Sequence, residues 1–100
     1  MSVEGQIKRV FGKDYKMALA VSQAENGTRK CDRVSKPNTN GSVDIGVFQV
    51  NTVHLKRVTE AELKTCLGNI RYAHSLFKKQ GHWGAWAAFN NGSYKRFLTE

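Results

Sequence analysis

The sequence predicts a mainly α fold: one helical domain over residues 1–100 with a small β-hairpin excursion near residues 38–50. Apolar residues recur at helical spacing in two long segments. Thr59-Glu60-Ala61-Glu62 has the Ser/Thr-x-x-Glu form that begins helices. The turn dipeptide Asn40-Gly41 precedes a short segment of alternating apolar and polar residues. With 100 residues, 40% of them apolar, the chain can bury a single modest core.

Two helices are expected in the first quarter of the chain. Residues 3–11 can form a short helix, and residues 14–25 have apolar side chains at helical spacing. The buried stripe of the second helix is expected to contain Met17, Val21 and Ala24. Asp14 is suited to its N-cap, and Gly27 to the left-handed position just beyond its end.

The next segment predicts a loop and then a short strand. Residues 28–42 are rich in Asn, Thr, Ser, Lys and Gly, and Asn40-Gly41 favours a tight turn within them. After the turn, the residues expected on one face are Val43, Ile45, Val47 and Gln49. Those expected on the other face are Asp44, Gly46 and Phe48.

The chain from Thr59 onward is expected to be mainly helical. One helix begins at Thr59, and another runs from Asn69 to near Gly81 with Ile70, Ala73 and Phe77 on one face. A third is expected around Trp83 to Phe89, with Trp83, Trp86 and Ala87 on one face and the tryptophans at core spacing. Tyr94 and Phe97 should then close the core from a final turn or helix.

The formal charge of +8 favours polyanionic partners such as nucleic acid, an anionic membrane surface or an acidic cell wall. The apolar stretches are too short to span a membrane, so no membrane span is expected. Residues 1–20 lack the apolar region of a secretory leader, so an exported protein would have lost its leader or use other machinery.

The cysteines and histidines do not predict a metal site. Cys31 and Cys66 stand far apart without a CxxC pattern, and no pair among His54, His74 and His82 has the ligand spacing of one helix. We therefore expect no metal and no cofactor. The cysteines can form either a disulfide, which would add roughly 3–4 kcal/mol, or two buried free thiols.

Glu25 is the strongest candidate for a chemically active group. It ends the buried stripe of the second helix, where partial desolvation would raise the pKa of its carboxyl and keep it protonated as a general acid requires. The alternative is a solvated glutamate at a frayed helix end. That alternative is weakened because a negative charge there opposes the helix dipole.

Four short motifs occur in order along the chain: AENG at 24–27, GVFQVN at 46–51, NI at 69–70 followed by Ala73, and AAFNNG at 87–92. Together they resemble the four motifs of the lysozyme-like lytic transglycosylases, over about residues 17–98. Separately, NTNGSVDIGVFQVN resembles the central strand of animal c-type lysozymes, where the second catalytic carboxylate occupies the Asp44 position. The resemblance implies an α+β lysozyme-like fold.

The same resemblance implies an enzyme that cleaves the β-1,4 bond between N-acetylmuramic acid and N-acetylglucosamine in peptidoglycan glycan strands, with Glu25 as the general acid. The positions that it implies for substrate binding are Asn26, Gln49, Asn51 and Asn90. Asp44 has three interpretations: a nucleophile or charge stabiliser, a brace for the turn and strand, or an ordinary exposed aspartate. A monomer is implied, located outside the cell, in the periplasm or at the cell wall.

Two departures and two alternatives accompany this interpretation. Phe89 stands where the fourth motif usually has tyrosine, and Asn26 where serine is commoner.

A catalytically inactive sugar-binding or interaction protein on the same fold is the first alternative. The second is a basic nucleic-acid-binding module, which the charge and the aromatic residues favour but no binding motif supports. We therefore expect no nucleic-acid partner.

Overall fold

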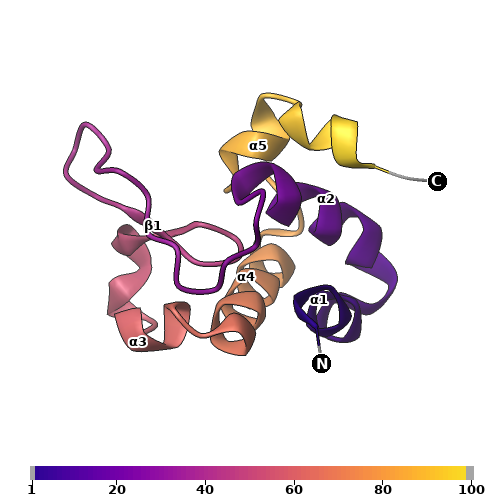
Figure 1. Cartoon of the computed structure of the whole chain (residues 1–100), viewed down its shortest axis with the longest axis horizontal. Helices are drawn as coiled ribbons and strands as arrows, with labels where there is room; N and C mark the ends of the chain where they lie inside the picture. Colours follow the sequence, from indigo (N-terminus) through magenta and orange to yellow (C-terminus); the bar gives the residue numbers. More distant parts are fainter. Residues whose placement is uncertain (1, 99–100) are drawn as a thin grey trace.

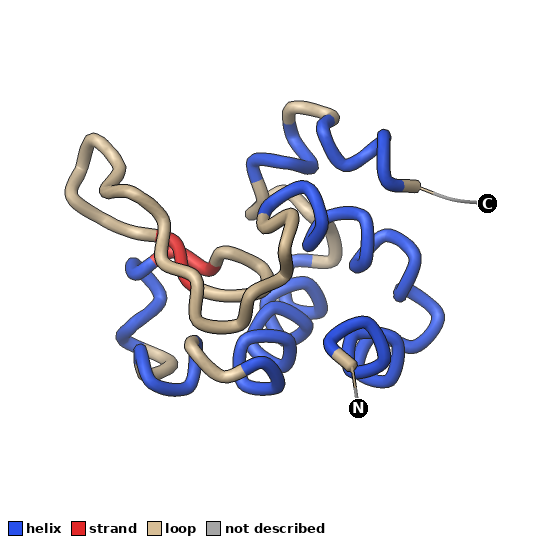
Figure 2. The backbone as a smooth tube through the Cα atoms, in the orientation of Figure 1, coloured by secondary structure: helices blue, strands red, loops and turns tan. Residues whose placement is uncertain are grey.

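The structure is a computed structural model that describes residues 2–98, and it is mainly helical with one small antiparallel sheet (Figure 1, Figure 2). In chain order the elements are α1 (Val3–Phe11), the 3₁₀ helix η1 (Gly12–Asp14), α2 (Tyr15–Glu25), β1 (Asp44–Ile45), β2 (Val50–Asn51), η2 (Thr52–Lys56), α3 (Glu60–Leu63), α4 (Cys66–Gln80), α5 (Ala87–Asn90) and η3 (Ser93–Phe97). Helix α4 lies between the hairpin with α3 on one side and α1 with α2 on the other (Figure 1). The predicted mainly helical class with a small β excursion is confirmed.

Helix α1 matches its predicted bounds, and the Ser2 hydroxyl caps it by accepting a hydrogen bond from the Gly5 N–H at 3.0 Å. Helix α2 begins at Tyr15, and the expected cap is wrong because the Asp14 side chain makes no capping hydrogen bond. Of the expected stripe, only Val21 is fully buried, while Met17 and Ala24 are half-buried. The helix face turned to the core instead carries Ala18, Ala20, Val21 and Ser22.

The end of α2 also differs from the prediction. Asn26 follows the helix in an extended conformation (φ −143°, ψ 91°), and Gly27 does not adopt a positive φ. The positive φ falls at Arg29 (49°). The Arg29 side chain returns to α2, where its guanidinium donates to the Ser22 hydroxyl and the Leu19 carbonyl, each at 3.0 Å.

The hairpin forms, but its turn lies later in the chain than expected. Strand β1 pairs with β2 with Asp44 opposite Asn51 and Ile45 opposite Val50, so residues 46–49 form the connection. Asn40-Gly41 does make a tight turn, in which the Gly41 N–H donates to the Asn38 carbonyl at 2.9 Å. That turn closes the loop before β1. Because the chain bends at Gly46 (φ 79°), the expected alternation ends there, and Val47 and Phe48, which were expected on opposite faces, are both fully buried.

Threonine caps define the starts of the next two helices. The Thr59 hydroxyl accepts from the Glu62 N–H at 3.1 Å, which confirms the predicted start of α3. The Thr65 hydroxyl accepts from the Gly68 N–H at 3.1 Å, so α4 begins at Cys66, earlier than the expected start at Asn69. It ends as predicted, with Gly81 in the left-handed conformation.

The C-terminal segment is less regular than expected. Helix α5 contains only Ala87–Asn90, so Trp83 and Trp86 lie in the preceding turn, although both are buried as predicted. Tyr94 is partly buried against the core, and its ring stacks on Phe89 with centroids 5.0 Å apart. Phe97 is 37% exposed and therefore does not close the core.

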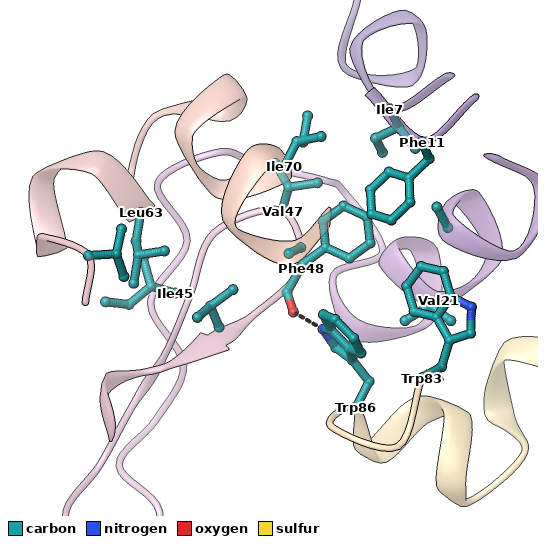
Figure 3. Close-up of a cluster of buried hydrophobic side chains, with 14 residues drawn as sticks. Ile7, Phe11, Val21, Ile45, Val47, Phe48, Leu63, Ile70, Trp83 and Trp86 are labelled. Carbon is teal, nitrogen blue, oxygen red and sulfur yellow. Dashed lines mark hydrogen bonds between the residues drawn. The ribbon is translucent and has the colours of Figure 1, made fainter. Parts of the chain in front are cut away.

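Phe48 lies at the centre of the core and joins the hairpin to the helices (Figure 3). Its ring centroid is 5.4 Å from that of Phe11 on α1 and 6.1 Å from that of Trp86. The Phe11 ring in turn stacks on Trp83 at 5.5 Å. One contiguous aromatic cluster thus connects α1, the hairpin turn and the segment before α5.

Buried hydrogen bonds fix the backbone of the hairpin turn. The Asn69 side chain of α4 donates to the carbonyls of Ile45 (2.8 Å) and Leu63 (2.9 Å) and accepts from the Phe48 N–H at 2.8 Å. The Trp86 indole N–H donates to the Phe48 carbonyl at 3.0 Å (Figure 3). Because unpaired polar groups at these depths would each cost about 1–3 kcal/mol, the turn has one well-defined position.

Gly46 provides a test of this packing. A methyl group at Gly46 would overlap the Asn69 amide and the Leu63 carbonyl, in addition to the cost of its positive φ. We expect Gly46→Ala to lower the free energy of unfolding by about 3 kcal/mol. Gly81→Ala is the matched control, because Gly81 has a similar φ (76°) and open space around it, so it should lose only about 1 kcal/mol. Equal losses in urea unfolding would contradict the tight packing.

Candidate functional site

A pocket of about 280 Å³ lies where the end of α2, the hairpin and the turn before α5 meet. Its lining residues are Glu25, Asn38, Asp44, Gln49, Val50, Asn51, His54, Leu76, Ala85, Trp86 and Ala87. The structure thus brings together four of the residues that the sequence singled out: Glu25, Asp44, Gln49 and Asn51. With Asn38, two carboxylates and three side-chain amides share one cavity.

Glu25 is the last residue of α2 and is half-buried in the pocket wall. Its Oε2 accepts a hydrogen bond from the backbone N–H of Ala88 at 2.9 Å. Burial raises the pKa of Glu25 above its ordinary value; the Ala88 N–H opposes this shift, and the negative charge of Asp44 adds to it. The net effect is a carboxyl group that keeps its proton to higher pH than a solvated glutamate.

Asp44, the first residue of β1, is held by two asparagine side chains. Its Oδ1 accepts from the Asn51 amide at 2.9 Å, and its Oδ2 lies 3.5 Å from the Asn38 amide nitrogen. Its backbone N–H donates to the Ser35 hydroxyl at 2.9 Å. Asp44 is therefore a half-buried, positioned side chain, which removes the interpretation of an ordinary exposed aspartate.

Gln49 and Asn51 line the pocket as expected, but their amide nitrogens already have protein partners. Gln49 (φ 49°) donates to the Gly46 carbonyl at 3.0 Å. Asn51 donates to Asp44 and to the Ser42 hydroxyl at 3.0 Å, while its oxygen accepts from the Val53 N–H. Both side chains thus also stabilise the hairpin.

The structure does not bring the other two candidates to the pocket. Asn26 is fully buried, and its amide donates to the carbonyls of Lys30 (2.9 Å) and Gly46 (3.1 Å). Asn90 is exposed on α5, away from the pocket lining, and donates to the Gly84 carbonyl at 2.8 Å. We assign both asparagines a structural part in place of the expected substrate contacts, because each amide is occupied by loop carbonyls.

Sequence reasoning missed the backbone donor to Glu25 and several pocket walls. Ala88 acts through its N–H, which no side-chain type reveals, although it lies within the AAFNNG motif. His54 and Leu76 come from η2 and α4, and neither belongs to a quoted motif. Trp86 was expected as a core residue and also forms part of the wall.

The two cysteines form a disulfide, which decides the alternative that the sequence left open. Cys31 and Cys66 are 35 positions apart in the sequence, and their Cα atoms lie 4.8 Å apart. The bond attaches the loop after α2 to the start of α4. By restricting the unfolded chain, it is expected to contribute roughly 3–4 kcal/mol.

The three histidines have separate environments. His54 Nδ1 lies 3.0 Å from the Tyr72 hydroxyl, the His74 ring packs edge-on against Phe11, and His82 accepts from the Gly84 N–H. Within residues 2–98 no group of three or more His, Cys, Asp or Glu side chains is arranged to hold a metal ion. In the same range no helix has the length and hydropathy needed to cross a membrane.

The sequence matches no protein-family model and no curated protein. A function must therefore be argued from the pocket itself. Its distinguishing feature is the pairing of Glu25, whose pKa is raised, with Asp44, whose oxygens face side-chain amides.

The pKa of Glu25 leads to a prediction about stability. Because its folded-state pKa is raised, the stability associated with its protonated form is present below the unfolded value of about 4.5 and is lost as pH rises through the folded pKa. Gln at this position resembles the protonated acid at every pH. We expect Glu25→Gln to unfold at a higher temperature than wild type at pH 8, with a smaller difference at pH 4.

Thermal unfolding followed by circular dichroism at the two pH values measures this difference. Asp32→Asn, which alters an exposed carboxylate, is the control and should show no such divergence. A pH-independent difference between Glu25→Gln and wild type would contradict the raised pKa.

Proposed function

We propose that this protein is a peptidoglycan-cleaving glycosidase of the lysozyme-like superfamily, a lytic transglycosylase or muramidase, with Glu25 as its general acid. The observation that carries the proposal is the half-buried Glu25 carboxyl in the pocket wall, with its pKa raised and its Oε2 held by the Ala88 N–H at 2.9 Å. The order of the four motifs supports it. The formal charge of +8 suits an anionic wall polymer.

Glu25 would protonate the glycosidic oxygen between N-acetylmuramic acid and N-acetylglucosamine. Because Oε2 accepts from Ala88, the proton of the neutral acid is carried by Oε1. As the bond breaks, positive charge develops at the anomeric carbon, and Glu25 becomes a carboxylate. The Ala88 N–H stabilises that carboxylate, and the nearby negative charge of Asp44 favours the cationic sugar.

Two routes complete the reaction. In the first, Asp44 attacks the anomeric carbon, and water later releases the sugar, as in a retaining hydrolase. In the second, the acetamido oxygen of the substrate attacks, the sugar's own O6 then closes a 1,6-anhydro ring, and Glu25 takes the O6 proton. We favour the second route because both Asp44 oxygens already face side-chain amides, as a brace would.

The general-acid assignment predicts that wild-type protein clears a suspension of peptidoglycan and that Glu25→Gln does so at least about 100-fold more slowly. The activity should also fall as pH rises through the raised pKa of Glu25, because the acid form is the active one. Turbidity measurements across the pH range test both expectations. Asp32→Asn should clear at the wild-type rate.

Equal clearing by wild type and Glu25→Gln would contradict the catalytic assignment. Binding of glycan strands without clearing by either protein would favour the inactive sugar-binding alternative. Salt-sensitive DNA binding without clearing would favour the nucleic-acid module.

The role of Asp44 predicts the reaction product. On the favoured route, Asp44→Asn should keep the activity within about 10-fold of wild type, since the amide oxygen can still accept one of the two asparagine hydrogen bonds. Mass spectrometry of the released fragments should then show the anhydro sugar, which is lighter than the hydrolysed product by one water. Hydrolysed products, together with loss of activity in Asp44→Asn, would identify Asp44 as the nucleophile instead.

A further inference from the structure

A second and larger pocket, of about 540 Å³, adjoins the one that holds Glu25. Its lining residues are Val53, His54, Lys56, Arg57, Tyr72, Leu76, Lys79 and Gln80. His54 and Leu76 line both pockets, so the two cavities are neighbours along one surface. We call the second one the cationic pocket.

The two pockets have opposite charge. The cationic pocket is lined by Lys56, Arg57 and Lys79 and by no carboxylate, whereas the first is lined by Glu25 and Asp44 and by no lysine or arginine. Across residues 2–98 the ion pairs are Arg29 with Glu4 and Lys64 with Glu60. The three cations of the pocket are therefore unpaired within the part of the chain that the structure describes.

The three cations of the cationic pocket come from two separate segments of the chain, and apolar side chains also line the pocket. Lys56 ends η2 and is followed by Arg57, whereas Lys79 lies in the last turn of α4. Tyr72 and Leu76 of α4 line the same pocket, and both are half-buried against the core. An anion in this pocket could be approached by charges from both segments while its carbon skeleton contacts these side chains.

His54 separates the two charged regions. Burial lowers the pKa of His54, and the positive charge of Arg57 lowers it further. The ring is therefore neutral near pH 7, and its Nδ1 lies 3.0 Å from the Tyr72 hydroxyl. The change of sign along the surface thus comes from Glu25 and Asp44 on one side and from the lysines and arginine on the other.

We propose that the cationic pocket binds a carboxylate of the same glycan strand whose bond lies at Glu25, so that this protein selects acidic over neutral polysaccharides. The inference rests on the proposed function and adds to it the substrate feature that is recognised. Two sources can supply the carboxylate: the lactyl group of an N-acetylmuramic acid that carries no peptide, or the peptide itself where one is attached through that lactyl group. The chemistry that Lys79 and Arg57 recognise is the same in both.

A charge-reversal pair tests the proposal. Lys79→Glu alters the cationic pocket, and Lys78→Glu makes the same change in net charge at the adjacent exposed residue, which lines neither pocket. Binding is measured with peptidoglycan glycan oligomers and with neutral N-acetylglucosamine oligomers of equal length. We expect Lys79→Glu to weaken binding of the acidic oligomer about 3- to 10-fold more than Lys78→Glu does. Neither variant should alter binding of the neutral oligomer by more than about twofold.

A third probe, the glycan oligomer with its peptides removed, identifies the source. Removing the peptides frees the lactyl carboxylates, so a Lys79→Glu effect with this probe shows that the pocket accepts a lactyl carboxylate. An effect seen only with the peptide-bearing oligomer shows that the pocket accepts the peptide carboxylate. Equal weakening by Lys79→Glu and Lys78→Glu, with wild-type activity intact, would overturn the cationic pocket and leave the proposed function standing. Failure of wild type to bind or cleave any oligomer would overturn both.

Discussion

The structure depends on the anchoring of the hairpin turn by buried side chains from three other segments. Asn69 of α4 provides two donors and one acceptor to the turn and to α3, and Trp86 donates to the Phe48 carbonyl. Asn26, just after α2, donates to the Gly46 carbonyl. Two strands of two residues each could not hold their position alone. Side-chain amides replace the missing strand pairing and fix the hairpin relative to the helices.

This anchoring also sets the distance between the two carboxylates. Glu25 directly precedes Asn26, and Asp44 stands two residues before Gly46. The hydrogen bond from the Asn26 amide to the Gly46 carbonyl therefore links the two chain segments that carry the acids. The Ala88 N–H adds a contact from α5 to Glu25. Both acids thus stand beside buried, hydrogen-bonded residues, and each is itself half-buried with hydrogen-bond donors of its own.

The sequence predicted the features that local chemistry determines. The Thr59 cap and the end of the helix near Gly81 follow from short-range rules, and the structure confirms both. The prediction from sequence failed where long-range contacts override the local pattern. Phe48 was placed on the face opposite Val47 because alternation cannot reveal the bend at Gly46, and Asn26 was assigned to substrate although Gly46, 20 positions away, occupies its amide. A backbone donor such as Ala88 has no side-chain signature.

The disulfide makes the hairpin region a covalently closed ring. Residues 31–66 contain β1, β2, η2 and α3, and the ring closes between Cα atoms 4.8 Å apart. Within this ring the exposed residues 36–41 lie outside the anchored turn, so this stretch can be lengthened or shortened without moving the buried hairpin or the helices around it. Evolution and protein engineers can therefore vary the edge of the cavity that carries Asn38 while Glu25 stays on its own helix.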